Sequence, residues 1–326
     1  MSLVSVIMPM RNARPFVADA LRSVLRQDGV ELEIIVVDDG STDGSGDVVR
    51  AMDDARIRMV IGPGKGIAAA FNTGLAAARG ELLARCDADD LFAPERLKWQ
   101  VELLNRMSDF GGVCGYYSTI DPRGKFVAEK NGEYPPEEVT QELRTGIGRS
   151  HMCAYLFRTD VIRKLGGCRT WFVTAEDRDL QFRLPDVARV WYEPSPAYIY
   201  RLHDASITHT KASRLKEFYN DAAREFQEQR AAGLIDDLDR GQPPDVPVFT
   251  NGEALSSAAE IQHLLISRAW RSHRAGKRSE AISDGWKACL ARPLGFFAWK
   301  SFVMLMLKPP GREVRPAPAQ AAERGS

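Results

Sequence analysis

Short apolar runs alternate with helical patterns over the first 120 residues, and this alternation does most to limit the fold. The apolar runs lie at 3–8, 34–37, 57–61, 81–86 and 112–117. The segments between them, such as 67–78 and 94–107, have the composition and spacing of helices. Nearly continuous apolar strands are typical of sheets buried on both faces, and strands that alternate with helices form βαβ units. The sequence therefore predicts an α/β domain with a Rossmann-like, mostly parallel sheet and flanking helices.

The pattern changes after residue 212. We expect the main domain over 1–212, a helix and linker over 213–252, a helical hairpin with an amphipathic region over 253–308, and a disordered tail over 309–326. Segment 293–308 is apolar and aromatic but too short to span a bilayer. It suits an interfacial helix, or equally a helix packed on its own domain. The hairpin is expected to pack on its own domain or on another subunit of a homo-oligomer.

Composition excludes several classes of protein. Lys and Arg together number 44, as do Asp and Glu, so a basic stripe for nucleic acid is unsupported. The five cysteines are scattered without Cys-x-x-Cys spacing, which argues against a disulfide framework or a zinc site and fits a reducing compartment. The apolar N-terminus lacks a basic region and is expected to be a strand, not a signal peptide. We expect a soluble, cytoplasmic protein.

Two acidic clusters follow predicted strands. Asp38 and Asp39 come after the second strand, and Asp87, Asp89 and Asp90 after the fourth. Ligands of parallel sheets bind beyond the carboxyl ends of the strands, so the two clusters can converge on one crevice. Carboxylates this close repel unless a cation lies among them, and oxygen ligands suit Mg²⁺ or Mn²⁺. The alternative is a solvated acidic turn that caps the helix beginning near Pro94.

The chain resembles the GT-A glycosyltransferases, and among them glycosyltransferase family 2, over roughly residues 3–210. The resemblance depends on six blocks in the expected order, at 4–12, 36–43, 66–80, 84–90, 175–180 and 200–208. They include Pro9-Met10-Arg11-Asn12, Asp38-Asp39-Gly40-Ser41, Asp87-Ala88-Asp89-Asp90, Glu176-Asp177 and Tyr200-Arg201-Leu202-His203. One such block is weak, because short motifs match by chance, but six in order are specific.

The resemblance implies a nucleotide-sugar donor, with a UDP-sugar favoured and thymidine or guanosine left open. The residues expected on the donor side are Pro9, Asn12, Asp38, Asp39, Lys65, Asn72, Arg85 and Asp87. Asp39 or Asp38 would accept the N–H of the base, and Asp87 would contact the ribose. Lys65 and Arg85 add positive charge near the phosphates, although each is equally well an ordinary surface cation.

The resemblance also implies a divalent metal, Mn²⁺ or Mg²⁺, on the diphosphate. Asp89 is the expected ligand, with Asp90 in support. His203 is a further candidate ligand, and Arg201 a candidate diphosphate contact. The alternative for His203 is a histidine bonded to backbone after an edge strand.

Asp177 is the candidate general base, and Glu176 is the alternative. A carboxylate near the acceptor hydroxyl removes the proton of that hydroxyl while the hydroxyl oxygen attacks the anomeric carbon. A single displacement of this kind inverts the configuration at the anomeric carbon. Without the other blocks, a Glu-Asp pair would be assigned to helix capping. Trp171, Phe172 and 143–153 line either the acceptor side or the core, and Gly167-Cys168-Arg169-Thr170 departs from the expected pattern.

The sequence thus predicts an inverting, metal-dependent glycosyltransferase of cell-envelope or exopolysaccharide synthesis, acting on a saccharide or lipid-linked acceptor. We expect it in the cytoplasm or peripherally on the inner face of the cytoplasmic membrane. A non-catalytic sugar-nucleotide scaffold is the alternative. A sugar nucleotidyltransferase is disfavoured because Pro9-Met10-Arg11-Asn12 replaces the expected glycine-rich loop, and 62–66 lacks the glycine spacing of a dinucleotide oxidoreductase.

Overall fold

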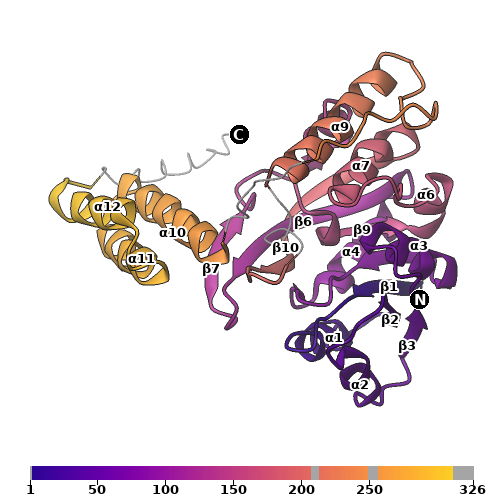
Figure 1. The fold of residues 1–326 in the computed structure, drawn as a ribbon, viewed down its shortest axis with the longest axis horizontal. Helices are drawn as coiled ribbons and strands as arrows, with labels where there is room; N and C mark the ends of the chain where they lie inside the picture. Colours follow the sequence, from indigo (N-terminus) through magenta and orange to yellow (C-terminus); the bar gives the residue numbers. More distant parts are fainter. Residues whose placement is uncertain (1, 207–212, 249–255, 311–326) are drawn as a thin grey trace, which may run out of the picture. The chain divides into compact units, whose positions relative to one another are not determined.

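A computed structural model describes residues 2–206, 213–248 and 256–310. Its strands are β1 (Leu3–Met10), β2 (Glu31–Asp38), β3 (Ile57–Ile61), β4 (Leu82–Arg85), β5 (Leu91–Phe92), β6 (Phe110–Ile120), β7 (Phe126–Lys130), β8 (Glu137–Glu138), β9 (Tyr155–Arg158) and β10 (Arg189–Arg201). Its α-helices are α1 (Val17–Leu25), α2 (Ser45–Arg50), α3 (Ile67–Ala77), α4 (Arg96–Arg106), α5 (Thr140–Arg144), α6 (Thr159–Lys164), α7 (Glu176–Arg183), α9 (Ser213–Ala231), α10 (Ser257–Arg274), α11 (Arg278–Ala291) and α12 (Phe296–Leu307). The described residues also contain two 3₁₀ turns, η1 (Met152–Ala154) and η2 (Leu184–Asp186). Figure 1 shows the fold.

The strands form one ten-stranded sheet in the order β3-β2-β1-β4-β9-β6-β10-β5, with β7 on β6 and β8 on β10. The first four are parallel, as the alternation predicts. Beyond β4 the sheet is mixed, because β9 enters antiparallel between β4 and β6. The predicted fifth strand therefore does not pair with the fourth. The α/β fold class is confirmed, but the sheet is mixed and not mostly parallel, because five of the nine strand pairings in the described residues are antiparallel.

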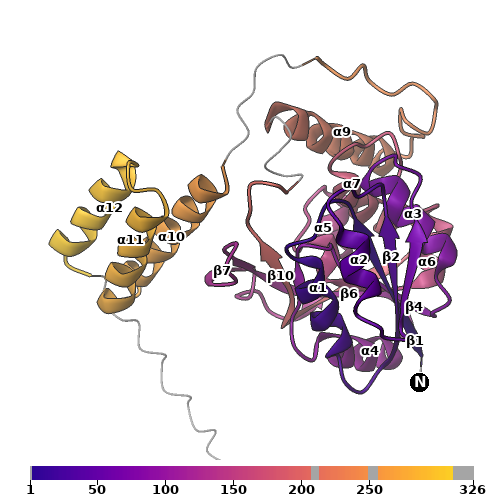
Figure 2. The same cartoon turned by 60° about the horizontal axis from the view of Figure 1, so that its bottom comes forward.

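Both faces of the sheet are buried. Side chains of β1 alternate between two apolar clusters, with Ile7 in one and Val6 and Met8 in the other. This alternation explains why the strand is an unbroken apolar run instead of an alternating one. Figures 1 and 2 both show α9 beside α7, with α7 the closer to the sheet.

Helix α3 packs unusually close to β1. A Cβ atom on Gly74 would lie 2.4 Å from Ile7 Cγ2, nearer than two carbon atoms can approach. Glycine at this position lets the helix lie directly on the strand. The start of α3, and the loop that precedes it, are thereby fixed at the carboxyl edge of β1 and β2.

The chain divides into two compact units, residues 1–254 and 255–326. In the second unit α10, α11 and α12 pack on one another. Over the described residues, no helix has both the length and the apolar content needed to cross a membrane. In the first unit, the segment that follows α9 includes Asp236, which is completely buried, so part of the expected linker is packed.

Candidate active site

The loop between β3 and α3 is held by Asp39. The backbone N–H groups of Gly64 and Gly66 donate to Asp39 Oδ1 and Oδ2, each at 2.7 Å. Both glycines have positive φ, and a Cβ on Gly62 would lie 2.7 Å from Asp39 Oδ1. The loop therefore needs glycines to close around this carboxylate. A carboxylate oxygen has two lone pairs, so each oxygen of Asp39 retains one for a further N–H.

Asn12 joins the ends of β1 and β2. Its Oδ1 accepts from Thr42 N at 2.8 Å, and its N–H donates to Ser41 Oγ at 3.0 Å. Asp38 accepts from Ser41 N at 2.9 Å. These contacts bring the first two predicted blocks together at the carboxyl edge of the sheet.

Other residues predicted on the donor side have different surroundings. Pro9 is buried within β1, opposite Val37 of β2. Asn72 binds the backbone of Cys168 through both groups of its amide, at 2.7 and 2.8 Å, and so ties α3 to the loop after α6. Lys65 is exposed. Of these three, only Lys65 has a side chain that reaches solvent freely.

Asp89 and Asp90, in the acidic motif after β4, have different surroundings. Asp90 is buried, and its carboxylate accepts from Tyr198 OH at 2.8 Å and from Arg201 N at 2.7 Å. Burial raises the pKa of Asp90 well above its usual range, and the charges of Asp89 and Asp87 add to this. Asp89 is partly exposed and lies 2.9 Å from His203 Nε2. Asp89 therefore faces the site, while Asp90 anchors the motif to β10.

Asp89 and His203 are the residues that fit a metal. His203 contacts a carboxylate, and its buried Nδ1 has no hydrogen-bond partner. Within the described ranges, no three His, Cys, Asp or Glu side chains gather as a complete ligand set. Mg²⁺ and similar ions often take one or two protein ligands and complete their shell with substrate phosphates and water. One carboxylate beside one imidazole suits such a shared site.

Arg85 links the acidic motif to helix α7. Its guanidinium is buried, and it donates to Asp87 Oδ1 at 2.6 Å and to Glu176 Oε1 at 3.0 Å. Two blocks of the sequence, separated by about 90 residues, thus meet on one cation. The positive charge of Arg85 is engaged by these two carboxylates.

The two carboxyl groups at the start of α7 differ in their electrostatics. Burial raises the pKa of Glu176 to about 7, against the opposing charge of Arg85. Burial also acts on Asp177, but His151, Arg85 and Arg178 outweigh it and hold the pKa of Asp177 below its usual value. Asp177 Oδ1 accepts from Arg178 N at 2.8 Å. At neutral pH, Asp177 is the group that is ready to accept a proton.

His151 belongs to segment 143–153, which was expected to line the acceptor side or the core, but no individual role was predicted for this residue. Its Nε2 lies 3.8 Å from Asp177 Oδ2, and its ring is stacked on Tyr198, with centroids 5.6 Å apart and planes 4° from parallel. No spacing motif links His151 to the acidic blocks, so the sequence pattern alone could not identify it.

Arg201, which was expected as a candidate diphosphate contact, donates through Nε to Asp89 O at 3.0 Å.

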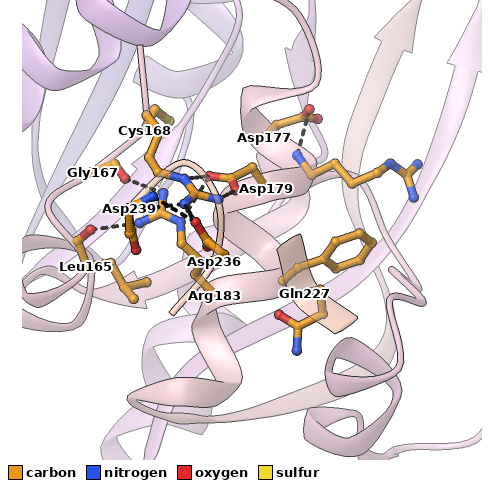
Figure 3. A network of polar contacts seen from close by, with 12 residues as sticks. Leu165, Gly167, Cys168, Asp177, Asp179, Arg183, Gln227, Asp236 and Asp239 are labelled. Atoms are coloured by element: carbon orange, nitrogen blue, oxygen red, sulfur yellow. Dashed lines mark hydrogen bonds and ion pairs between the residues drawn. The ribbon is translucent and has the colours of Figure 1, made fainter. Parts of the chain in front are cut away.

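A buried network of ion pairs connects α7 to the segments before and after it in the chain (Figure 3). Arg169 donates to Asp179 of α7 and to both oxygens of Asp236 at 2.8 Å, and Arg183 donates to Asp179 at 3.0 Å. Arg230 of α9 also contacts Asp236. Trp171 and Phe172 pack against aromatic side chains of α9 and belong to the hydrophobic core on this side of the sheet. The helix that carries Asp177 is therefore fixed by residues far along the chain.

Comparison with known proteins gives three kinds of match. The family model "Glycosyl transferase family 2" matches residues 5–166. Two relatives come from Bacillus subtilis (strain 168). The uncharacterized glycosyltransferase EpsJ is 32% identical over 63% of this chain and 63% of its own length. The putative glycosyltransferase EpsH is 30% identical over 66% of this chain and 65% of its own length. The matched region thus spans less than two thirds of either relative.

Two solved structures share the fold. S. aureus TarS 1–349 in complex with UDP-GlcNAc has a TM-score of 0.59 at 17% identity, over 94% of this chain and 89% of that one. The mannosyltransferase PcManGT from Pyrobaculum calidifontis, in complex with GDP-Man and Mn²⁺, has a TM-score of 0.53 at 21% identity, over 93% and 84%. At these identities the likeness concerns the GT-A fold.

Proposed function

Residues 5–166 belong to glycosyltransferase family 2, and from that premise we propose that the chain transfers a sugar from a nucleotide-sugar donor to a hydroxyl group, with inversion. The acceptor is a saccharide or a lipid-linked saccharide of cell-envelope or exopolysaccharide synthesis. The observation that carries the proposal is the bridge through Arg85, which joins the acidic motif to the helix that begins with Glu176 and Asp177. A transferase needs its donor site and its base side by side, and this bridge couples them.

On the donor side, a UDP-sugar is the favoured substrate. Asp39 is buried at the carboxyl edge of β2, and each of its carboxylate oxygens retains a lone pair for the N–H of a base. Asp87 follows β4 at the same edge of the sheet, and we expect it to contact the ribose. TarS in its complex binds UDP-GlcNAc, whereas PcManGT binds GDP-Man, so uridine and guanosine are the two bases to test first.

Asp89 and His203 would hold Mn²⁺ or Mg²⁺ with the donor diphosphate. The bound ion would supply positive charge to the leaving phosphate oxygens. Asp177 accepts the proton of the acceptor hydroxyl at a carboxylate oxygen. The acceptor oxygen then bonds to the anomeric carbon as the bond from that carbon to the diphosphate breaks, and the nucleoside diphosphate leaves.

The second unit supports a peripheral contact with an anionic membrane surface. Residues 256–310 contain nine Lys and Arg against three Asp and Glu, a surplus of six positive charges. Leu294 and Phe296, before and at the start of α12, are 98% and 81% exposed. Exposed apolar side chains within a basic helical unit bind anionic lipid surfaces. Such a contact would place the enzyme on the inner face of the cytoplasmic membrane, near a lipid-linked acceptor.

Thermal unfolding tests the donor and metal assignments. We expect UDP or GDP to raise the midpoint by several degrees only when Mn²⁺ is present, because a ligand at about 100 times its Kd adds about 2.7 kcal/mol. In Asp89→Asn, the nucleotide should no longer raise the midpoint when Mn²⁺ is present. Asp28→Asn, an exposed carboxylate on the turn after α1, is the matched control and should behave as wild type. A shift that needs no metal, or no shift with either nucleotide, would contradict the proposal.

A further inference from the structure

His151 has its proton on a defined nitrogen. It precedes η1, and its Nδ1 accepts the N–H of Cys153 at 3.3 Å. A nitrogen that accepts a hydrogen bond carries a lone pair, so the neutral ring carries its proton on Nε2. Nε2 is the nitrogen that faces Asp177 Oδ2.

The orientation of the ring is fixed by tyrosines. Tyr198 stacks on it nearly parallel, and Tyr200 and Tyr117 lie with ring centroids at 5.7 and 6.0 Å. Tyr198 is itself held to the acidic motif, because its hydroxyl donates to Asp90 Oδ2 at 2.8 Å and accepts from Asp87 N at 3.0 Å. The histidine therefore sits at a defined place relative to both Asp87 and Asp177.

Its charge state agrees with this geometry. Burial lowers the pKa of His151, and Arg85 and Lys216 act in the same direction, against Asp177 and Asp87. The ring is therefore neutral near pH 7. A neutral ring whose Nδ1 is engaged and whose Nε2 bears the proton can donate to a carboxylate but has no free lone pair for a proton. His151 is thus unsuited to act as the base.

We propose that His151 is a positioning residue, whose Nε2–H orients the carboxylate of Asp177 towards the acceptor hydroxyl while Tyr198 holds the imidazole to the donor-side motif. The inference rests on the proposed function, in which Asp177 is the base. The separation of 3.8 Å is longer than a hydrogen bond, and such contacts commonly shorten when substrate closes the site. His151 keeps its proton throughout, and the proton of the acceptor goes to Asp177.

The tautomer gives a test that needs no substrate. The full chain labelled with ¹⁵N-histidine has five histidines, and the ring signals of His151 are those lost in His151→Gln. We expect an unprotonated Nδ1 and a protonated Nε2, whose proton resonance moves in Asp177→Asn. A proton on Nδ1, or an Nε2 signal that Asp177→Asn leaves unchanged, would overturn the inference.

The second test is kinetic, with water as the acceptor. The readout is nucleotide released from UDP-GlcNAc or GDP-mannose with Mn²⁺, using whichever donor the wild type hydrolyses. His151→Ala should lower kcat by about 10- to 100-fold, because a misplaced catalytic group costs about that much, and leave KM for the donor unchanged. His151→Gln should recover most of kcat, since its amide N–H can reach the position of Nε2. His263→Ala, an exposed histidine of α10, is the control.

The variants distinguish a failure of the proposed function from a failure of the positioning role alone. If Asp177→Asn turns over normally, the base assignment in the proposed function is wrong. If Asp177→Asn is inactive but His151→Ala is fully active, only the positioning role fails. Equal losses of kcat in His151→Ala and His151→Gln, together with a lower Tm in both, would assign the residue to packing and overturn the inference.

Discussion

Asp177 and Glu176 are neighbours in the sequence, but their surroundings shift their pKa values in opposite directions. Glu176 is buried, and its pKa is raised to about 7. Asp177 faces His151, Arg85 and Arg178, which together hold its pKa below the usual value despite burial. A general base must be unprotonated to act, so these two shifts predict different pH dependences for the two candidates.

With Asp177 as the base, we expect kcat/KM to show no acidic loss between about pH 5.5 and about pH 8.5, because a group with a lowered pKa stays ionised throughout that range. With Glu176 as the base, activity would fall by half near pH 7 and continue to fall below it. The measurement is nucleotide release against pH at saturating Mn²⁺. Asp177→Asn should lose about 10²- to 10⁴-fold, and Glu176→Gln should retain the flat profile. The reverse result would move the role to Glu176.

At the scale of elements, α7 depends on ion pairs with segments outside the family match. Arg169, Arg183 and Arg230 share the buried carboxylates of Asp179 and Asp236. Figure 3 labels Arg183, Asp179 and Asp236 of this network. Asp239 also contacts Arg169, at 3.3 Å, but its side chain is 55% exposed. Breaking a buried ion pair leaves an uncompensated charge, whereas an exposed pair contributes little.

Asp236→Ala should therefore lower the free energy of unfolding by about 3–5 kcal/mol. Asp239→Ala removes a carboxylate from the same arginine and should cost at most about 1 kcal/mol. Urea unfolding of both variants measures the difference. Equal midpoints would mean that the buried network does not stabilise α7.

At the scale of the whole molecule, charge is unevenly divided. The described residues of the second unit are strongly basic, although the complete chain is neutral, so the rest of the chain is acidic. Trp286 of α11 and Trp299 of α12 contact each other, with Lys287 and Lys300 exposed beside them. Aromatic side chains beside lysines suit the boundary between lipid headgroups and acyl chains.

We expect the full chain to float with vesicles of phosphatidylcholine and phosphatidylglycerol, but not with phosphatidylcholine alone, and salt should weaken the binding. A variant with Leu294→Glu and Phe296→Glu should float less. The control carries Leu234→Glu and Val248→Glu, which are exposed apolar residues of the first unit. Equal flotation of the two variants would contradict the membrane contact, and a dimer that only the first variant loses would assign the surface to a second copy of the chain.

Much of the site could be predicted from sequence because its parts are local. The apolar runs set the strands, and the carboxyl ends of the parallel strands set the edge of the sheet at which Asp39 and Asp89 lie. Asp89 contacts His203, and these residues come from the two blocks that were predicted to share a metal; the metal itself stays a prediction. The direction of each side chain was not predictable, since Asp89 and Asp90 are adjacent but face opposite environments.

The sequence by itself determined the α/β class, the strands of the parallel half and the blocks that we propose carry the chemistry, because these depend on periodicity and on residue type within short windows. Only the tertiary structure decided that β9 enters antiparallel, that Arg85 joins two distant blocks, and that Asp236 is a buried partner of Arg169 rather than part of a linker. It also brought His151 to Asp177. These contacts join residues separated by 26 to 91 positions, and such long-range pairing depends on packing that no local pattern encodes.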